Sequence, residues 1–432
     1  MIKYTDKFNQ EIKLGEKIGK GGEATVYELQ GKSGLVAKIY NDEHLIDKQK
    51  LKKLERMCEL YDKKIAKYYA WPQEIIYCEN KPVGFVMENI NNPSKNQDGS
   101  EYNKFINFYA SKARQKFFPQ AEYRFMVHSA INLTIAIQIL HRKGIVIGDI
   151  NESNVCINNL DTTVKLIDCD SYQIEDYLCD VGTLLYTAPE LPNKLRGLKR
   201  TENNDNFALA VMIFMILVGQ HPYFRAGITM DNLRQSVIDG MFPYGENAKN
   251  KNIEAQFPYS NIYDSLSDEI KELFEKAFCT LNRPSANDWI LALENFENQL
   301  VQCGSHKGHW HNSDNKACIW CELEHDGFYA FGNNPKRTKK IQHNYNIRTQ
   351  NQTTYTSSIN NTQPNFTLAG QTSNYIQQTP QMNQPLKYFL IISFVILFSV
   401  AASLISSDNY VSDNAYENNQ EFLQGGVQKV ER

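Results

Sequence analysis

HRKGIVIGDINESNV at residues 141–155 and LIDCDS at residues 166–171 are the two stretches that decide the fold of this chain. In the first, Asp149 is followed five residues later by Asn154, and in the second an apolar run leads to Asp168. Asx turns at the ends of two strands would use the same residues for local structure alone. Further motifs, which follow in order on both sides, favour a functional centre over that alternative.

Together the two stretches resemble the catalytic loop and the metal-binding motif of protein kinases. The resemblance implies that Asp149 orients the substrate hydroxyl and accepts its proton, while Asn154 and Asp168 ligand Mg²⁺. It also implies ATP as the cosubstrate and an α+β, bilobal kinase-like fold with a small β-rich lobe and a large helical lobe.

Three departures from the kinase pattern carry consequences of their own. Gly148 stands where an arginine usually holds a phosphorylated activation segment, which argues against that form of regulation. Asn151 replaces a lysine that commonly touches the γ-phosphate, so slower chemistry or a different phosphate clamp is expected. Cys169 and Asp170 replace the usual Phe and Gly, so a motion built on a packed phenylalanine is not expected.

An amino-terminal lobe with a glycine-rich loop is predicted from residues 17–27, KIGKGGEATVY. A plain hairpin turn would look similar, but the strand LVAKIY at residues 35–40 follows with Lys38, which resembles the lysine that grips the α- and β-phosphates. The resemblance assigns four residues of this loop to the nucleotide, with Ala24 where a third glycine is usual: Gly19, Gly21, Ala24 and Val26.

A buried lysine needs an anionic partner, and in kinases this is a glutamate on the next helix. Residues 47–60 have helical apolar spacing and offer Glu55 and Glu59, of which we favour Glu55, although both also suit an exposed surface. Residues 82–90 resemble the kinase hinge, where the backbone of Glu88 and Ile90 would contact adenine.

Later elements extend the resemblance, so that residues 1–302 are predicted to form the kinase-like domain. Residues 182–190, GTLLYTAPE, resemble the end of an activation segment, in which Glu190 would pair with Arg283. The apolar run up to Val218 is predicted to be a central helix whose Asp205 braces the catalytic loop. The motifs look like a branch of bacterial kinase-like proteins with a cysteine-rich segment after the kinase domain.

That segment, residues 303–325, is predicted to be a zinc knuckle. Thiolates with an imidazole form a four-ligand tetrahedral set that suits zinc, and a closed set of this kind is structural. We assign the ligands as Cys303, His309, Cys318 and Cys321, with His306 or His311 as substitutes for His309. Free surface thiols are the alternative. The metal would fold a small unit that core burial could not hold.

Beyond residue 325 the composition changes twice. Residues 326–386 are rich in Gln, Asn, Thr and Ser and are predicted to be a disordered linker. Residues 387–407 are predicted to be a single transmembrane helix, because twenty residues from 388 onward carry no charge. Basic residues precede this run and acidic residues follow it, so the kinase domain is expected to be cytoplasmic at the inner or plasma membrane, with residues 408–432 as a short external tail.

The sequence therefore predicts a membrane-tethered kinase that transfers the ATP γ-phosphate to Ser or Thr hydroxyls of a protein substrate. A pseudokinase that binds ATP and recruits partners is the alternative, and a small-molecule kinase on the same fold also stays open. The net charge of −3 gives no clear nucleic-acid site, and nine scattered cysteines suit a reducing cytosol. An opposing protein phosphatase is a further expected partner.

Overall fold

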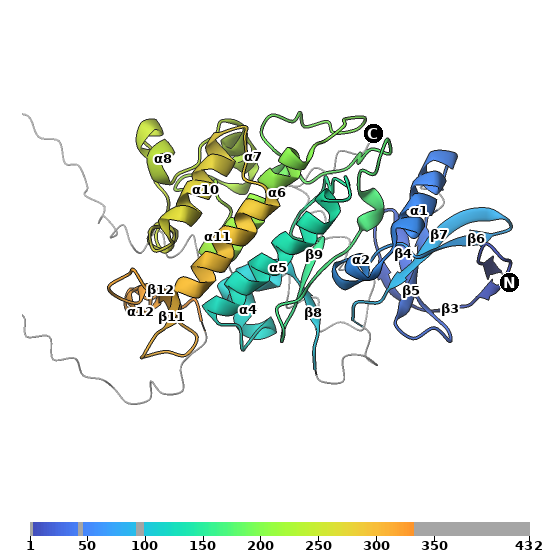
Figure 1. Cartoon of the computed structure of the whole chain (residues 1–432), viewed down its shortest axis with the longest axis horizontal. Helices are drawn as coiled ribbons and strands as arrows, with labels where there is room; N and C mark the ends of the chain where they lie inside the picture. Colours follow the sequence, from blue (N-terminus) through green and yellow to red (C-terminus); the bar gives the residue numbers. More distant parts are fainter. Residues whose placement is uncertain (1–2, 42–45, 92–98, 332–432) are drawn as a thin grey trace, which may run out of the picture. The chain divides into compact units, whose positions relative to one another are not determined.

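The computed structural model describes residues 3–41, 46–91 and 99–331, and these form two lobes (Figure 1). The bilobal α+β fold predicted from the sequence is confirmed. The first lobe contains a seven-stranded antiparallel sheet in the order β2-β1-β6-β7-β5-β4-β3. Its strands are β1 Tyr4–Thr5, β2 Glu11–Ile12, β3 Leu14–Lys20, β4 Ala24–Leu29, β5 Leu35–Tyr40, β6 Glu74–Cys78 and β7 Lys81–Glu88.

Strands β5 and β7 pair unusually closely at Gly84. Gly84 lies opposite Ile39, and a Cβ at this position would stand only 2.1 Å from the carbonyl oxygen of Lys38. Only glycine fits such a close backbone approach. The register that results fixes Lys38 between Val26 on β4 and Phe85 on β7.

Two helices accompany the sheet, α1 Lys48–Leu60 and α2 Lys63–Tyr68. Asp47 caps α1 by accepting a hydrogen bond from the Lys50 amide at 2.7 Å, as its position before the apolar periodicity predicts. Leu54 and Met57 are fully buried, so they fix which face of α1 packs on the lobe. Lys53 is buried on the same helix.

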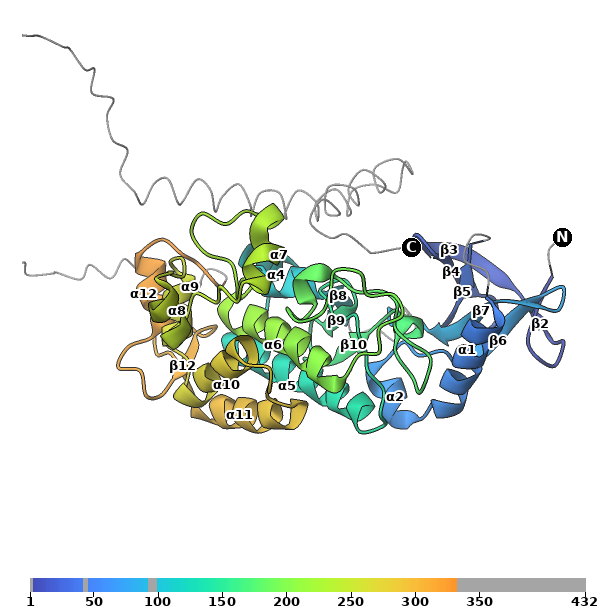
Figure 2. The ribbon, with the colours of Figure 1, turned by 90° about the horizontal axis from the view of Figure 1, so that it is seen from above.

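The second lobe is helical, with a small sheet in the order β10-β9-β8. Its helices are α3 Phe105–Tyr109, α4 Ser111–Phe117, α5 Tyr123–His141, α6 Glu202–Val218, α7 Met230–Ile238, α8 Gly245–Lys251, α9 Tyr259–Asp264, α10 Asp268–Cys279 and α11 Ala286–Gln299. The small sheet consists of β8 Tyr102–Lys104, β9 Val155–Asn158 and β10 Val164–Leu166. Helices α5, α6 and α11 run side by side (Figures 1 and 2).

Helix α6 is the core of this lobe. Every residue from Asp205 to Val218 is buried, so the helix is packed on all sides, as an apolar run of this kind requires. Aromatic rings pack around Phe214, including Phe274 with a centroid separation of 4.9 Å. The helix begins with a capping box between Thr201 and Asn204, which places the buried Asp205 in its first turn.

Residues 300–331 pack onto the helical lobe instead of forming a separate small unit. This segment contains β11 Leu300–Gln302, β12 Trp310–Asn312 and α12 Ile319–His325. The Trp320 ring lies 4.7 Å from the Tyr123 ring of α5, and Arg114 donates to the Ala330 carbonyl at 2.8 Å. The segment is therefore not the separate small unit that was predicted, since its apolar side chains join the main core.

The predicted start of the linker at residue 326 is also wrong. Ala330 and Phe331 are buried in the same core, with the Phe331 ring 5.1 Å from the Trp320 ring. The ordered chain therefore reaches at least residue 331. Within the described residues no helix combines the length and apolar character needed to cross a bilayer. The predicted linker beyond residue 331, the membrane span at 387–407 and the tail lie outside the described residues.

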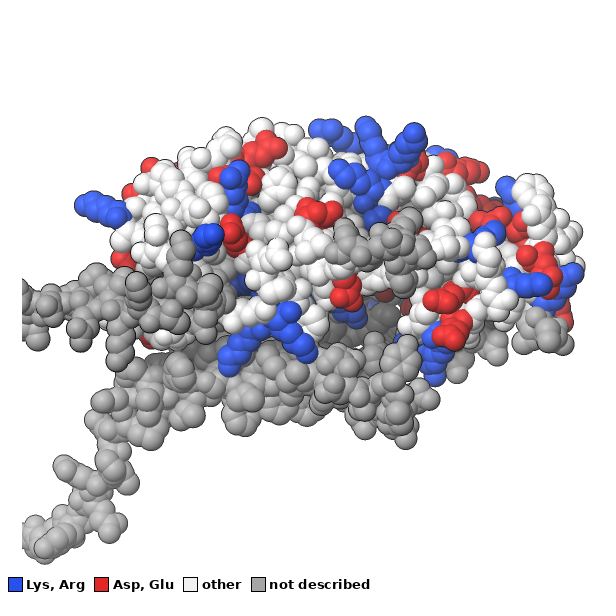
Figure 3. All heavy atoms as spheres, turned by 90° about the horizontal axis from the view of Figure 1, so that it is seen from below, with Lys and Arg blue, Asp and Glu red and all other residues white. Residues whose placement is uncertain are grey.

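Charged side chains of both signs are spread over the face shown in Figure 3. One basic group lies where α2 meets the end of α5, around a surface pocket of about 530 Å³. The residues that line this pocket are Asp62, Lys63, Lys64, Ile139, Arg142 and Lys143. Lys143 is paired with Asp62 at 2.9 Å, so the positive charge there is partly neutralised.

Candidate active site and metal centre

The loop that carries Asp149 is held by a buried carboxylate. Asp205 accepts hydrogen bonds from the backbone amides of Ile147 at 2.7 Å and Gly148 at 2.8 Å. The His141 ring lies 3.0 Å from the same carboxylate. The predicted bracing of the loop by Asp205 is confirmed. Buried amides must be satisfied, so this one side chain fixes the backbone just before Asp149.

An arginine that the sequence did not suggest occupies the space beside Gly148. The Arg200 guanidinium donates to the carbonyl oxygen of Gly148 and, at 2.5 Å, to that of Val181. Gly148 offers no guanidinium of its own, and Arg200 supplies one from the segment before α6. It is buried and binds backbone carbonyls, so it joins the catalytic loop to the activation segment without a phosphate.

Asp149 is oriented by three donors on one of its oxygens. Oδ1 accepts from the Thr183 amide at 2.9 Å, the Thr183 hydroxyl at 3.0 Å and the Asn151 side chain at 2.8 Å. Asn154 donates to Oδ2 over a longer distance, 3.4 Å. This arrangement fixes the carboxylate plane and leaves Oδ2 as the oxygen best placed to accept a proton.

Asn154 and Asp168 lie together at the open end of one hairpin. Strands β9 and β10 pair through Val155 and Leu166, and the Ile167 amide donates to the Asn154 carbonyl at 2.9 Å. Asp168 comes next, with a left-handed backbone at φ 56° and a side chain that is 56% exposed. Two oxygen-bearing side chains at the end of one hairpin suit a hard divalent cation.

Lys38 joins the two lobes through two aspartates. Its ammonium lies 2.7 Å from Asp170 Oδ1 and 3.0 Å from Asp168 Oδ1. Burial alone would lower the pKa of Lys38, but the charges of Asp170 and Asp168 raise it well above its usual value. Burial alone would raise the pKa of Asp170, but the charge of Lys38 and the hydrogen bonds from Lys38 and Tyr40 hold it below its usual range. The pair is therefore ionised.

The prediction that a glutamate of α1 pairs with Lys38 is wrong. Glu55 lies on the exposed face of α1, and the alternative, Glu59, is exposed and pairs with Arg56 at 2.9 Å. The α1 residues that point inward are the buried Leu54 and Met57, which fix the helix rotation, together with Lys53. Only one face of a helix can pack against the lobe, and the buried face of α1 carries no glutamate.

The remaining residues that were predicted to contact the nucleotide lie on the β3–β4 hairpin, or at the end of β7 and just after it. Gly19 lies near the end of β3 and Gly21 begins the turn to β4, where the Gly21 amide donates to the Ala24 carbonyl at 2.8 Å. Val26 is the direct β-sheet neighbour of Lys38.

Glu88 ends β7, and its side chain pairs with Lys165 of β10. Ile90 follows in a turn, and residues 92–98 after it lie outside the described part of the chain.

The end of the activation segment is fixed by two buried contacts. Arg283 forms a bidentate pair with Glu190, 2.8 Å from each carboxylate oxygen, so the predicted ion pair is confirmed. Glu152, in the catalytic loop, accepts hydrogen bonds from Tyr109 and Tyr186, and burial raises its pKa. These contacts hold the segment against the helical lobe.

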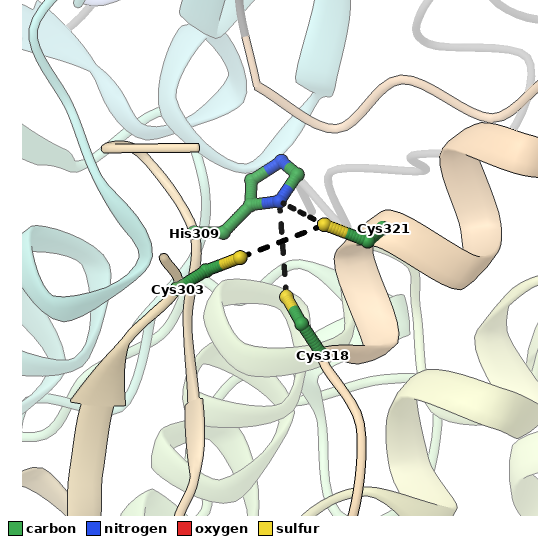
Figure 4. A group of neighbouring side chains, drawn as sticks. All are labelled: Cys303, His309, Cys318 and Cys321. Carbon is green, nitrogen blue, oxygen red and sulfur yellow. Dashed lines mark hydrogen bonds between the residues drawn. The ribbon is translucent and has the colours of Figure 1, made fainter. Parts of the chain in front are cut away.

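The four predicted zinc ligands come together at the end of the described chain (Figure 4). Cys303 follows β11, Cys318 and Cys321 lie at the start of α12, and His309 Nδ1 points between the sulfurs. His309 Nδ1 is 3.5 Å from Cys321 Sγ and 3.8 Å from Cys318 Sγ, and Cys303 Sγ is 3.6 Å from Cys321 Sγ. Zinc–sulfur and zinc–nitrogen bonds in a tetrahedron place their donors about 3.5–3.8 Å apart. The donor atoms therefore fit a zinc ion.

The surroundings of these donors fit a cation as well. The other ring nitrogen of His309 lies 3.3 Å from the buried carboxylate of Glu324, the usual support for a metal-bound imidazole. Burial and the nearby Cys303 sulfur raise the pKa of Cys318 to about 11. Three thiolates cannot share this space without positive charge. His306 stacks on His309 at 3.9 Å, and His311 lies against the Asn312 carbonyl, so His309 is the histidine that faces the sulfurs.

Comparison with known proteins agrees with this geometry. Residues 12–290 match the protein kinase domain family. The chain belongs to the protein kinase family.

It is 31% identical to the protein kinase YegI of Escherichia coli K12 over 346 residues, which cover 76% of this kinase and 51% of YegI. YegI of Escherichia coli O157:H7 is 30% identical over 333 residues, which cover 73% of this kinase and 50% of that YegI. The kinase thus spans about half the length of these curated bacterial relatives. Atypical protein kinase C of Drosophila melanogaster is 30% identical over 136 residues, which are 30% of this kinase. A kinase domain implies ATP and Mg²⁺.

Several residues of this kinase site escaped the sequence analysis. Two of these residues are Asp170 and Tyr40. Tyr40 carried a usable signal, because it lies two residues after Lys38 and therefore on the same face of β5. Glu324 carried another, three residues after Cys321 on a helix. Arg200 and Thr183 carried none, since their contacts depend on how distant loops meet.

Replacing Gly148 tests the contact with Arg200. Gly148 has φ +77°, and a Cβ there would lie 2.8 Å from both Arg200 Nη1 and Cys179 Sγ. We expect Gly148→Ala to lower the unfolding midpoint by the equivalent of about 1–3 kcal/mol and to reduce activity.

Gly144→Ala is the matched control, since Gly144 has φ +70° with nothing near its Cβ position. Thermal unfolding of both variants measures the difference. Equal losses of stability would contradict a special role for the space beside Arg200.

Proposed function

We propose that this chain is a membrane-tethered protein kinase that phosphorylates Ser or Thr hydroxyls of protein substrates. The observation that carries the proposal is the state of Asp149, whose Oδ1 is fixed by Thr183 and Asn151 while Oδ2 accepts only a 3.4 Å hydrogen bond from Asn154 among the described residues. A carboxylate held in this way orients a hydroxyl and takes its proton. A pseudokinase would have no need for such an arrangement.

Other residues of the site have separate roles in the proposed reaction. Asp168 and Asn154 supply the oxygens for Mg²⁺, which neutralises charge on the phosphates when bound. Lys38 supplies the cation for the α- and β-phosphates. Asn151 cannot contact the γ-phosphate as a lysine would, because both ends of its side chain are engaged. Its Nδ2 donates to Asp149, and its Oδ1 accepts from the Ser153 backbone amide at 2.8 Å. This loss of one positive charge is the observation that favours the pseudokinase alternative.

Two substitutions should damage different steps. Asp168→Ala should lose the Mg²⁺ dependence of nucleotide binding, because the metal loses its main anionic ligand. Asp149→Asn should leave binding nearly intact but reduce phosphoryl transfer by about two to four orders of magnitude. Nucleotide affinity with and without Mg²⁺, and transfer to a protein acceptor, are measured for both variants beside the parent.

A different result would select the pseudokinase. If the parent binds Mg-ATP but transfers phosphate to no acceptor, and Asp149→Asn changes nothing, the enzyme proposal fails. Phospho-amino-acid analysis of the acceptor tests the Ser/Thr assignment, and phosphotyrosine or a phosphorylated small molecule would contradict it.

The Cys/His cluster is proposed to hold one structural zinc ion. Support comes from the donor spacing and from the His309–Glu324 contact. Four protein ligands leave no open position for water, so the metal would stabilise the docked segment and take no part in the chemistry.

Metal content tests this proposal directly. We expect about one zinc ion per chain in the purified full-length protein, and Cys318→Ser should abolish it because a thiolate ligand is lost. Cys279→Ser is the control, since Cys279 is an exposed thiol outside the cluster. Emission spectrometry that finds no zinc in the parent would overturn the assignment.

The membrane tether at residues 387–407 is proposed from the uncharged, mostly apolar run at residues 388–407 and the charges that flank it. We expect protease added outside intact cells to remove only the tail after residue 407, because the amino-terminal side is cytoplasmic. A tag at Met1 should be protected from the protease, and digestion of that tag would show that the proposed orientation is wrong. An opposing protein phosphatase stays a prediction.

A further inference from the structure

The anion nearest to the nucleotide lysine of this kinase comes from the segment after Asp168 and not from helix α1. We propose that Asp170 is the positioning residue that holds Lys38 for the nucleotide phosphates, in the role that a helix glutamate would otherwise fill. This inference rests on the proposed phosphoryl transfer and names the residue that prepares its phosphate-binding cation.

The two aspartates that contact Lys38 differ in their surroundings. Asp170 is the closer, at 2.7 Å, and its side chain is only 6% exposed, whereas the Asp168 side chain is 56% exposed. An exposed carboxylate is free to ligand Mg²⁺, but a buried one that is already paired is not. The geometry therefore separates the roles, with Asp168 toward the metal and Asp170 toward the lysine.

Asp170 is itself fixed on both oxygens. Oδ1 accepts from Lys38, and Oδ2 accepts from the Tyr40 hydroxyl at 2.5 Å. Tyr40 lies two residues after Lys38 on β5, so one strand face supplies both donors. Lys50 of α1 stands 3.7 Å above the Tyr40 ring and adds positive charge around the same carboxylate.

Helix α1 therefore contributes the opposite charge from the one expected. Its inward side carries Lys50 and the buried Lys53, while Glu55 is exposed. In kinases that depend on a helix glutamate, rotating the helix unpairs the lysine. Here the pairing joins β5 to the activation segment, so it follows from the placement of residues 168–170 and survives a rotation of α1.

Asp170→Asn in the full-length kinase tests the inference, because the amide keeps the shape of the side chain but removes its charge. Lys38 would then pair only with Asp168 and draw it away from the metal. We expect ATP affinity to fall about 10- to 100-fold both with and without Mg²⁺, since the defect lies in the lysine. Glu55→Gln is the matched control on α1, and its affinity should stay within about twofold of the parent.

A second background separates positioning from general damage. In Lys38→Met, the further change Asp170→Asn should leave ATP affinity unchanged and should raise stability, because a buried unpaired carboxylate is removed. A full loss of affinity in that background, or equal behaviour of Asp170→Asn and Glu55→Gln in the parent, would overturn the inference.

The role of Asp170 can still be tested if the Asp170→Asn variant does not fold or if the parent does not transfer phosphate. If Asp170→Asn is unfolded by circular dichroism, Tyr40→Phe replaces it, and its affinity for ATP should fall about two- to fivefold. Unchanged affinity in Tyr40→Phe would then count against Asp170. If the parent binds ATP without transfer, the proposed enzyme fails, while the affinity series still decides the role of Asp170.

Discussion

The buried carboxylate of Asp205 is the constraint on which the rest of the helical lobe depends. A carboxylate in the core is costly unless its oxygens are satisfied, and here two backbone amides and the His141 ring satisfy them. The amides belong to Ile147 and Gly148, so the same contacts that make the core tolerable also fix the catalytic loop. Asp149 is the next residue, so its backbone is held in a fixed position, as a general base requires.

A second buried charge sets the junction between the lobes. Lys38 is buried and ionised, and removing one partner of such a pair leaves an uncompensated charge at a cost of about 3–5 kcal/mol. The partner can stand on any element that reaches the lysine, provided that the element itself is held in place. Asp170 meets this condition through Tyr40, so α1 is free to carry lysines on its inward side. A carboxylate other than a helix glutamate therefore occupies the position beside Lys38.

Sequence reasoning succeeded where a motif or a periodic pattern identified the residue and its element, and failed where packing alone decides how elements meet. Periodicity predicted the helix around Asp205, and the resemblance to protein kinases implied the strand of Lys38 and the pair between Glu190 and Arg283. Glu55 failed because helical spacing does not give the rotation of α1, which the packing of Leu54 and Met57 decides. The docking of residues 300–331 failed for a related reason, since short apolar stretches do not reveal which surface covers them.

That docking links the Cys/His cluster to the catalytic loop through a single helix. Tyr123 at the start of α5 packs against Trp320, and its backbone amide donates to the Gly308 carbonyl at 3.2 Å, one residue before His309. At the other end of α5, about 27 Å away by helix rise, His141 contacts Asp205. A helix that is anchored at both ends resists fraying, and its second anchor is the carboxylate that holds Ile147 and Gly148. The cysteine-rich segment is therefore packed on the same helix that reaches the carboxylate holding the catalytic loop.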